Sequence, residues 1–250
     1  MTAALETTDL RKSFGGIAAT AGVRLRLEPG ARHALIGPNG AGKTTLINLL
    51  TGVLRPDAGR IALDGRDVTG LAADRRVRLG MVRTFQINQL FADMTPVETI
   101  RLAVTQRLGR GTDWWRARAD GTAVADGMAE VIERFGLADV LDVPTSSLAY
   151  GKQRLLEIAI AFACQPRVLL LDEPAAGVPE DERHEILAAV AALPREVSVL
   201  LIEHDMDLVF SFAERISVLV NGALLTEGTP DAIAADARVR AVYLGEGGHG

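Results

Sequence analysis

The feature that constrains this chain most is a glycine-rich segment that follows an apolar stretch and precedes a helical one. The segment fits the pattern G-x-x-x-x-G-K-[ST], and its residues are Gly37, Pro38, Asn39, Gly40, Ala41, Gly42, Lys43 and Thr44. Residues 34–36 before it are apolar, as in a strand, and residues 45–50 after it, beginning with Thr45, have helical periodicity. Glycines let successive backbone N–H groups point inward, and a helix N-terminus adds partial positive charge. The sequence therefore predicts a strand, a phosphate-binding loop and a helix in succession.

The last two residues of the loop extend this prediction to a nucleotide with a metal ion. We expect Lys43 to reach the β- and γ-phosphates and the Thr44 hydroxyl to hold Mg²⁺. The alternative, a glycine-rich turn without a ligand, does not account for the combination of strand, glycines, Lys-Thr and helix. A phosphate-binding loop alone occurs in kinases, GTPases and many ATPases, so the rest of the chain has to distinguish among them.

Two apolar stretches later in the chain end in polar residues. Residues 168–171 run into Asp172 and Glu173, and residues 199–202 lead to His204. Strands of this kind are typical of parallel sheets, which bind ligands at the carboxyl ends of their strands. We expect Asp172 to hold Mg²⁺ through water, Glu173 to polarise the attacking water and His204 to contact the γ-phosphate.

Gln86 is a further candidate at a strand end. It follows a strand-like stretch that begins at residue 81, and an amide oxygen can coordinate Mg²⁺ or the attacking water without adding charge. The four histidines are dispersed and show no ligand spacing, which argues against a histidine metal site.

Apolar periodicity predicts an α/β core with an inserted helical segment. Strands are expected at residues 5–13, 23–27, 32–36, 60–63, 81–85, 168–171, 197–202, 216–220 and 224–227. Helices are expected at residues 43–51, 97–107, 123–135, 151–164 and 180–192. We expect a single domain over residues 1–250, with a core and β subdomain at 1–86 and 165–228, a helical subdomain at about 87–164, and an extension at 229–250 that is disordered from about residue 245.

Composition argues against several classes of protein. The formal net charge of −5 argues against nucleic acid as the main partner, and we interpret the basic run at residues 75–78 as a solvated helix face rather than a docking patch. No apolar stretch approaches the roughly 20 residues that a membrane-spanning helix needs, and the first residues lack the pattern of a signal peptide. We therefore expect a cytoplasmic protein. Cys164 is the only cysteine, so no internal disulfide can form.

The segment before the Asp-Glu strand resembles the ABC signature motif, L-S-x-G-Q. Its residues are Leu148, Ala149, Tyr150, Gly151, Lys152 and Gln153. With this segment, the chain resembles the ABC ATPases over essentially its whole length, because the motifs occur in the order of that family. It resembles most the LivG-type ATPases of branched-chain amino acid importers, through residues 83–86, 172–177, 202–206, 227–230 and 241–245.

The resemblance implies a fold, an activity and ligands. The implied fold is a nucleotide-binding domain with a P-loop NTPase core, an antiparallel β subdomain and an inserted α-helical subdomain. The implied activity is Mg²⁺-dependent hydrolysis of ATP to ADP and phosphate. In such a site Phe14 stacks on the adenine and Gln86 belongs to the Q-loop, while the signature segment contacts the ATP held by a partner subunit.

The resemblance also implies partners. These are a second ABC ATPase subunit, usually a different chain but possibly a second copy, two integral-membrane permease subunits and, indirectly, a periplasmic substrate-binding protein. The chain would then lie on the inner face of the cell membrane. A permease helix docks beside the Q-loop in this family, and the candidate contacts here are Ile87, Gln89, Leu90 and Phe91.

Three residues depart from the family pattern. Ala149 replaces the signature serine, whose hydroxyl bonds the γ-phosphate, and losing one such bond costs about 0.5–3 kcal/mol. Lys152 replaces the signature glutamine and is one of three lysines among 27 basic residues. It is either a substitute contact to the γ-phosphate or a tolerated surface change. In the family, Asp or Asn usually closes the loop after the residue that corresponds to Glu173, and here Pro179 stands in that place. Whether this loop couples the two subunits of a dimer is therefore an open question.

The motifs bear on four possible functions. The first is an ATPase that powers uptake of branched-chain or other hydrophobic amino acids, and the second is a related system for urea or amide uptake or for lipopolysaccharide export. The third, a non-transport ABC protein acting on ribosomes or DNA, usually has two cassettes or long coiled-coil insertions. The fourth, a regulatory half with a weakened signature, conflicts with the intact Lys43, Asp172, Glu173 and His204. Because ATPase subunits do not touch the cargo, no residue here encodes it.

Overall fold

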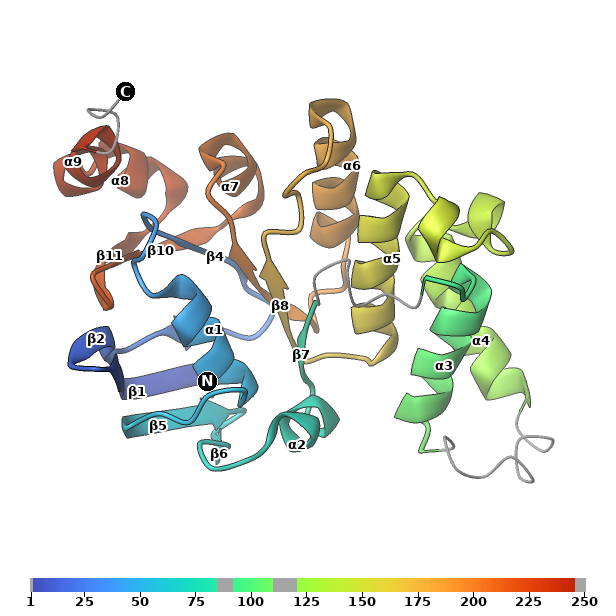
Figure 1. Cartoon of the computed structure of the whole chain (residues 1–250), viewed down its shortest axis with the longest axis horizontal. Coiled ribbons are helices and arrows are strands. Elements are labelled where there is room, and N and C mark those ends of the chain that lie inside the picture. Colours follow the sequence, from blue (N-terminus) through green and yellow to red (C-terminus); the bar gives the residue numbers. More distant parts are fainter. Residues whose placement is uncertain (1, 85–91, 110–120, 246–250) are drawn as a thin grey trace.

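A six-stranded sheet forms the centre of the computed structural model, which describes residues 2–84, 92–109 and 121–245 (Figure 1). The strands, in spatial order, are β11 (Ala223–Gly228), β10 (Arg215–Val220), β4 (Arg32–Ile36), β9 (Ser198–Ile202), β8 (Val168–Asp172) and β7 (Met81–Arg83). The strands from β10 to β7 are parallel, whereas β11 pairs antiparallel with β10. β4 and β9 are buried along their whole length because both faces of the sheet are covered, as is typical of parallel sheets, and each strand begins with one or two buried polar side chains before its apolar ones.

The N-terminal part of the chain forms a smaller antiparallel sheet. Its strands are β2 (Ile17–Val23), β1 (Leu5–Phe14), β5 (Ala58–Leu63) and β6 (Arg66–Asp67), with β3 (Arg26–Leu27) also paired to β1. Helix α1 (Lys43–Thr51) joins the two sheets into one core. Its buried side chains belong to the same apolar cluster as residues of both sheets, and they are Leu46, Ile47, Leu49 and Leu50. The short helix α2 (Ala73–Arg78) contacts β7.

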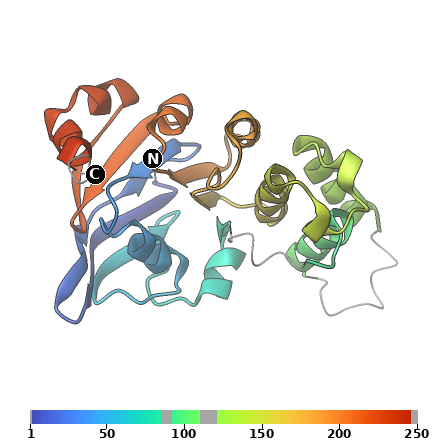
Figure 2. The same ribbon diagram turned by 45° about the horizontal axis from the view of Figure 1, so that its top comes forward.

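Three helices pack against one another beyond β7 and β8, on the side away from the smaller sheet (Figures 1 and 2). They are α3 (Pro96–Arg107), α4 (Gly121–Arg134) and α5 (Tyr150–Ala163), with 3₁₀ turns at Ala138–Val140 and Thr145–Ser147 between α4 and α5. The rings of Phe135 and Phe162 meet edge to face with centroids 5.7 Å apart. α5 also contacts α6 (Glu180–Ala191). The remaining helices are α7 (Met206–Phe212), between β9 and β10, and α8 (Pro230–Ala235) and α9 (Ala237–Gly245), which follow β11.

No helix in the described part of the chain is both long and apolar enough to cross a membrane.

The structure corrects two sequence-based predictions. The strand predicted at residues 23–27 is wrong, because Val23 ends β2 and the short β3 begins only at Arg26. β2 was not predicted, although Gly15 and Gly16, both with positive φ, form the turn that pairs it with β1.

The basic run at residues 75–78 is not uniformly solvated. Arg76 is 1% exposed and donates hydrogen bonds to the carbonyls of Leu49, Leu50, Thr69 and Leu71, whereas Arg75 and Arg78 lie at the surface. The interpretation as a solvated helix face is therefore wrong for this one arginine, because its buried guanidinium donates to backbone carbonyls.

Candidate functional site

The strand order brings the separate polar motifs to one edge of the six-stranded sheet. β9 lies between β4 and β8, and Ile202 at its end is level with both Leu35 and Asp172. The loop at residues 37–44 leaves the carboxyl end of β4, while His204 follows β9 and Glu173 follows β8. Three motifs that are far apart in the sequence thus meet at neighbouring strand ends, which is where open α/β sheets bind ligands.

The loop after β4 has a backbone that requires glycine at two positions. Gly37 passes so close to the carbonyl oxygen of Leu219 that a Cβ atom would overlap it, and Gly42 approaches the carbonyl oxygen of Ala19 in the same way. Gly42 is also the N-cap of α1, with φ 102°. A side chain at either position would push apart the loop, β2 and β10. We call residues 37–44 the glycine cradle. Its backbone is tightly turned in front of the α1 N-terminus, as binding of phosphate oxygens requires.

Lys43 places its ammonium group across this loop. Its Nζ donates to the carbonyl oxygens of Gly37 at 2.5 Å and Pro38 at 3.0 Å. The ammonium group is therefore held at the first residues of the glycine-rich loop. Thr44 and Thr45 belong to the first turn of α1, whose N–H groups have no acceptor within the helix.

Asp172 is held in place by an arginine that sequence reasoning did not assign to the site. Arg83, at the end of β7, donates to Oδ2 of Asp172 at 2.6 Å and to Oδ1 of Asn48 at 2.9 Å. Asn48 lies on α1, one turn after Thr44. The interaction joins β7, β8 and α1, so the carboxylate has a fixed position beside the helix that carries Thr44. The only sequence signal for Arg83 was its place in the segment 83–86.

Oxygen ligands suit the metal that we expected here. Mg²⁺ prefers carboxylate, hydroxyl, water and phosphate oxygens, and it is usually held by one or two carboxylates together with the phosphates of the nucleotide. The Thr44 hydroxyl and the Asp172 carboxylate have this chemistry, and the glycine cradle fits a phosphate chain.

Glu173 and His204 face each other at the ends of β8 and β9. Oε1 of Glu173 lies 3.8 Å from Nδ1 of His204, and both side chains are solvent-accessible, with 46% and 65% of their surface exposed. The backbone of Glu173 has φ 49°, a left-handed conformation that costs a residue with a side chain about 1–3 kcal/mol. Its N–H donates to the carbonyl of Ile202 at 2.9 Å, which helps to hold this conformation.

Phe14 lies on the hairpin of β1 and β2, next to the glycine-rich loop. The hairpin approaches the loop at Ala19, whose carbonyl oxygen lies against Gly42. Gly222, in the turn between β10 and β11, accepts from the N–H of Ala21 and donates to the carbonyl of Ala41 in the loop. Phe14 is 48% exposed, and the ammonium of Lys12 lies 5.6 Å from its ring centroid. An exposed ring at this place can stack on a flat base. Gln86, and with it residues 87, 89, 90 and 91, falls outside the described residues.

The signature segment lies apart from the loop of its own chain. It opens α5, which Figure 1 shows on the other side of β8 and α6 from α1. Leu148 and Gly151 are buried, and a Cβ atom at Gly151 would overlap the carboxylate of Glu182 on α6. Ala149 is the N-cap of α5, and Gln153 donates to the carbonyl of Leu148 at 2.9 Å. The segment is therefore packed onto α6, and its place is compatible with a ligand supplied by another subunit.

Lys152 and Pro179 take part in the same packing. Nζ of Lys152 donates to the carbonyl of Gly136 at 3.0 Å and lies 3.7 Å from Oε1 of Glu185. Pro179 is the N-cap of α6, where its carbonyl accepts from Glu182 and Arg183. A contact between Lys152 and a phosphate would require the ammonium to leave its partners within the chain.

We expect Lys152→Ala to lower ATP hydrolysis by the assembled transporter at least about tenfold, or about 1.4 kcal/mol in activation free energy. This expectation rests on the interpretation of Lys152 as a substitute contact to the γ-phosphate of an ATP held by a partner subunit. Steady-state turnover of the purified complex measures it, and Glu185→Ala is the control because it removes only the contact within the chain. Unchanged turnover would exclude Lys152 from the mechanism, and a lower melting temperature alone would assign it to helix packing.

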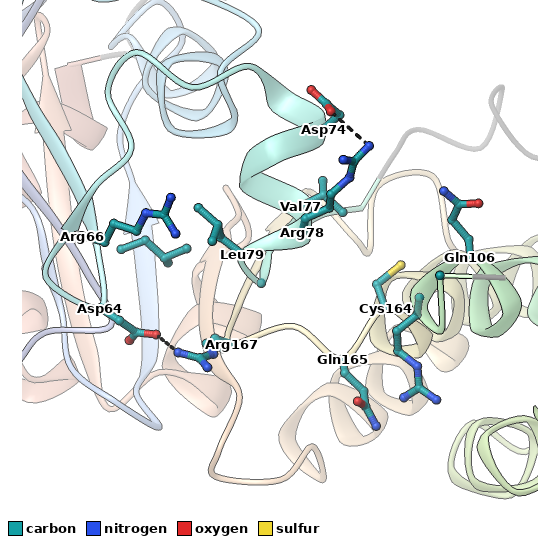
Figure 3. A pocket seen from close by; sticks show the side chains of 14 residues that line it. Asp64, Arg66, Asp74, Val77, Arg78, Leu79, Gln106, Cys164, Gln165 and Arg167 are labelled. Carbon is teal, nitrogen blue, oxygen red and sulfur yellow. Dashed lines mark hydrogen bonds and ion pairs between the residues drawn. The ribbon is translucent and has the colours of Figure 1, made fainter. Parts of the chain in front are cut away.

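A separate cavity of about 1030 Å³ opens at the opposite ends of the strands (Figure 3). Gly80 and Arg167, which immediately precede β7 and β8, line it together with residues of α2 and of the C-terminal ends of α3 and α5. Four arginines and two aspartates lie around it, and two ion pairs, Arg167–Asp64 and Arg78–Asp74, cross its wall. The cavity is distinct from the strand-end site.

Comparison with known families matches two parts of the chain. Residues 20–176 match the family described as ABC transporter, and residues 223–249 match the family described as branched-chain amino acid ATP-binding cassette transporter.

Characterised relatives cover nearly the whole chain. It is 42% identical over 249 residues to BraF of Pseudomonas aeruginosa, a high-affinity branched-chain amino acid transport ATP-binding protein, covering 97% of this chain and 98% of that protein. Identity to LivG of Escherichia coli K12, which has the same description, is 42% over 251 residues, with 97% and 98% covered.

Solved structures agree with the observed architecture. The ADP conformation of an ATP-binding cassette of an ABC transporter superposes with a TM-score of 0.84 at 29% identity, covering 98% of this chain and 100% of that chain. A nucleotide-free cassette gives a TM-score of 0.82 at 29% identity, covering 97% and 99%. The predicted fold class is thereby confirmed.

Proposed function

This chain belongs to the ABC transporter family of ATP-binding cassettes, and we propose that it is the Mg²⁺-dependent, ATP-hydrolysing subunit of an importer for branched-chain or other hydrophobic amino acids. The observation that carries the proposal is the meeting of the glycine cradle, Asp172 with Glu173, and His204 at three neighbouring strand ends. The match of the C-terminal part to a branched-chain amino acid transporter family, and the names of the relatives, support the cargo class.

Each residue of the site has one task in the proposed reaction. Lys43 and the N–H groups of the cradle bind the β- and γ-phosphates, and Thr44 and Asp172 hold Mg²⁺, which neutralises charge on the phosphates when it is bound. Glu173 accepts a proton from the attacking water. Its carboxylate is solvent-accessible at the strand end, so a water molecule can reach it. His204, 3.8 Å away from it, contacts the γ-phosphate, and Phe14 stacks on the adenine.

The proposed assembly follows the pattern of an ABC importer. The chain pairs head to tail with a second ABC ATPase, so that residues 148–153 of each contact the ATP of the other. Two permeases bind this pair on the inner face of the membrane, and a periplasmic binding protein delivers the cargo. Residues 87, 89, 90 and 91 are the proposed permease contacts.

Reconstitution in proteoliposomes tests the proposal. The chain is combined with the permeases, second ATPase and binding protein of neighbouring genes, and ATP hydrolysis is measured with and without leucine, isoleucine or valine. We expect these amino acids to stimulate hydrolysis severalfold, because the loaded binding protein promotes closure of the ATP sites. Stimulation by urea or short amides but by none of the three amino acids would contradict the cargo class, and no ATP hydrolysis in any mixture would contradict the activity.

A further inference from the structure

The turn that follows Glu173 sets the direction of this side chain. It connects β8 to α6, and its backbone is closed by hydrogen bonds from Ala176 N–H to the carbonyl of Glu173 at 3.1 Å and from Val178 N–H to that of Ala175 at 3.2 Å. Gly177 has φ 75°, and a Cβ atom there would meet the ring of Tyr150 at 3.0–3.4 Å. Because Glu173 itself is in a left-handed conformation, a small shift of this turn would redirect its carboxylate.

A buried carboxylate holds the turn from the side of β9. Glu203 follows this strand and is 1% exposed. Its Oε1 accepts from the N–H of Ala175 at 3.2 Å, and its Oε2 accepts from the N–H of His204, also at 3.2 Å. Burial raises the pKa of Glu203 above its usual value, so keeping a carboxyl group here has a cost. The side chain ties the backbone after Glu173 to the backbone of His204.

A buried ion pair holds the same turn from the side of α5. Arg154 donates to Oε2 of Glu157 at 2.8 Å, and its second terminal nitrogen donates to the carbonyl of Ala176 at 3.4 Å. The Tyr150 hydroxyl donates to the same carbonyl at 3.2 Å and accepts from Arg154 at 3.3 Å. Ala176 thus receives two hydrogen bonds from the first turns of the helix that begins with the signature segment.

Stability alone does not explain this ion pair. Burial raises the pKa of Glu157 to about 7, although the adjacent Arg154 guanidinium acts in the opposite direction. A buried ion pair is often no more stabilising than apolar residues of similar volume. What an apolar pair could not supply is the hydrogen bond to Ala176, which depends on the forked geometry of the guanidinium.

We propose that Glu203 and Arg154 are positioning residues for ATP hydrolysis, which hold the turn after Glu173 at two successive residues. Glu203 fixes the N–H of Ala175 from the strand that leads to His204, and Arg154, oriented by Glu157, fixes the carbonyl of Ala176 from the signature helix. Glu173 is then correctly directed only when both elements are in place. The inference rests on the proposed role of Glu173 and adds two residues that never contact the nucleotide.

Conservative variants in the reconstituted transporter test this role. Glu203→Gln keeps the shape of the side chain but replaces one acceptor oxygen by an NH₂ group. Arg154→Lys keeps the positive charge beside Glu157 but loses the two separate nitrogens with which the guanidinium bonds Glu157 and Ala176. We expect each to lower kcat about tenfold while KM for ATP changes less than about twofold. The fold-decrease in kcat of the double variant should be smaller than the product of the two single fold-decreases, because both residues act on one turn.

Matched controls carry the same chemical changes elsewhere. Arg134→Lys alters an arginine that donates to the carbonyl of Ala192 at the end of α6, and Glu227→Gln alters a carboxylate on β11 that accepts from Ser217 and Arg215. Both should leave kcat within about twofold of wild type. If the controls lower kcat as much as Glu203→Gln and Arg154→Lys do, the effect belongs to general packing and the proposal is wrong.

A second measurement does not depend on hydrolysis. Amide hydrogen exchange at Ala175 in the full chain should be about tenfold faster in Glu203→Met than in wild type, because methionine offers no oxygen acceptor to the N–H of Ala175. Unchanged exchange together with unchanged kcat would overturn the proposal. A wild-type transporter that does not hydrolyse ATP would instead contradict the proposed function, and exchange at Ala175 would still decide whether Glu203 holds the turn.

Discussion

Glu173→Gln is expected to lower kcat for ATP hydrolysis by about 10²–10⁴-fold, the usual contribution of a general base, while ATP binding persists. The amide has nearly the same shape as the carboxylate but cannot take the proton of the attacking water. Binding should survive because the cradle and Lys43 lie at the end of β4, whereas Glu173 follows β8. Phosphate release measures the first effect, and titration with a fluorescent ATP analogue measures the second.

A matched control separates this effect from a change of surface charge. Glu214→Gln makes the same substitution at an exposed carboxylate that pairs with Arg195 at 2.7 Å, at the start of β10 and away from the strand-end site. It should leave kcat unchanged within about twofold. Retention of more than a tenth of wild-type activity in Glu173→Gln would rule out this carboxylate as the general base.

The same variant reports on the partner. Slow hydrolysis should trap any dimer bridged by ATP, so light scattering of Glu173→Gln with and without Mg-ATP shows whether the chain pairs with itself. We expect it to remain a monomer while binding ATP, because the signature segment carries Ala149 and Lys152 and we propose that a different ATPase subunit completes the site. Conversion to a dimer would show that a homodimer can close on ATP.

Elements with a strong local pattern could be predicted from the sequence. β4 and α1 have the predicted bounds, because the glycine-rich loop fixes where the strand must end and the helix begin. β8 and β9 differ from prediction by one residue each, since the four consecutive apolar residues in each leave little freedom. β2 was missed because its side chains are mostly alanine and threonine and half of them are exposed, so apolar alternation is weak. α7 has only seven residues, too few for a periodic signal.

The site itself could be predicted only as a set of motifs. Which motifs meet depends on the strand order, and the pairing of β4 with β9 joins distant parts of the chain that no local pattern connects. The supporting residues were missed for a related reason. Arg83, Arg154 and Glu203 act through partners on other elements, and their local sequence does not distinguish a buried, bonded side chain from a solvated one.

Arg76 is the clearest example of this limit, and it gives the largest expected effect on stability. Its guanidinium donates to the carbonyls of Leu49 and Leu50 at the C-terminal end of α1. It also donates to the carbonyls of Thr69 and Leu71, in the loop that leads into α2. The last turn of α1 contains no basic residue of its own, so the positive charge that favours a helix C-terminus comes from α2. The N-terminus of the same helix belongs to the proposed phosphate-binding site.

We expect Arg76→Met to lower the free energy of unfolding by about 2–4 kcal/mol, because buried carbonyls lose their donors and the helix end loses its cation. For a chain of this length that corresponds to a fall in Tm of about 5–15 °C. Arg75→Met and Arg78→Met are controls on the same helix, with side chains 65% and 63% exposed, and should stay within about 0.5 kcal/mol of wild type.

Arg76→Lys separates charge from geometry. A lysine keeps the positive charge near the α1 terminus but cannot reach the helix end and the loop at the same time, because its donors are on one nitrogen. We expect it to recover less than half of the stability lost in Arg76→Met, as measured by urea unfolding. Full recovery would mean that charge alone matters, and equal losses in all three methionine variants would mean that the burial of Arg76 has no energetic importance. A loss confined to position 76 would show that one arginine of the basic run supports the helix whose N-terminus we propose to bind phosphate.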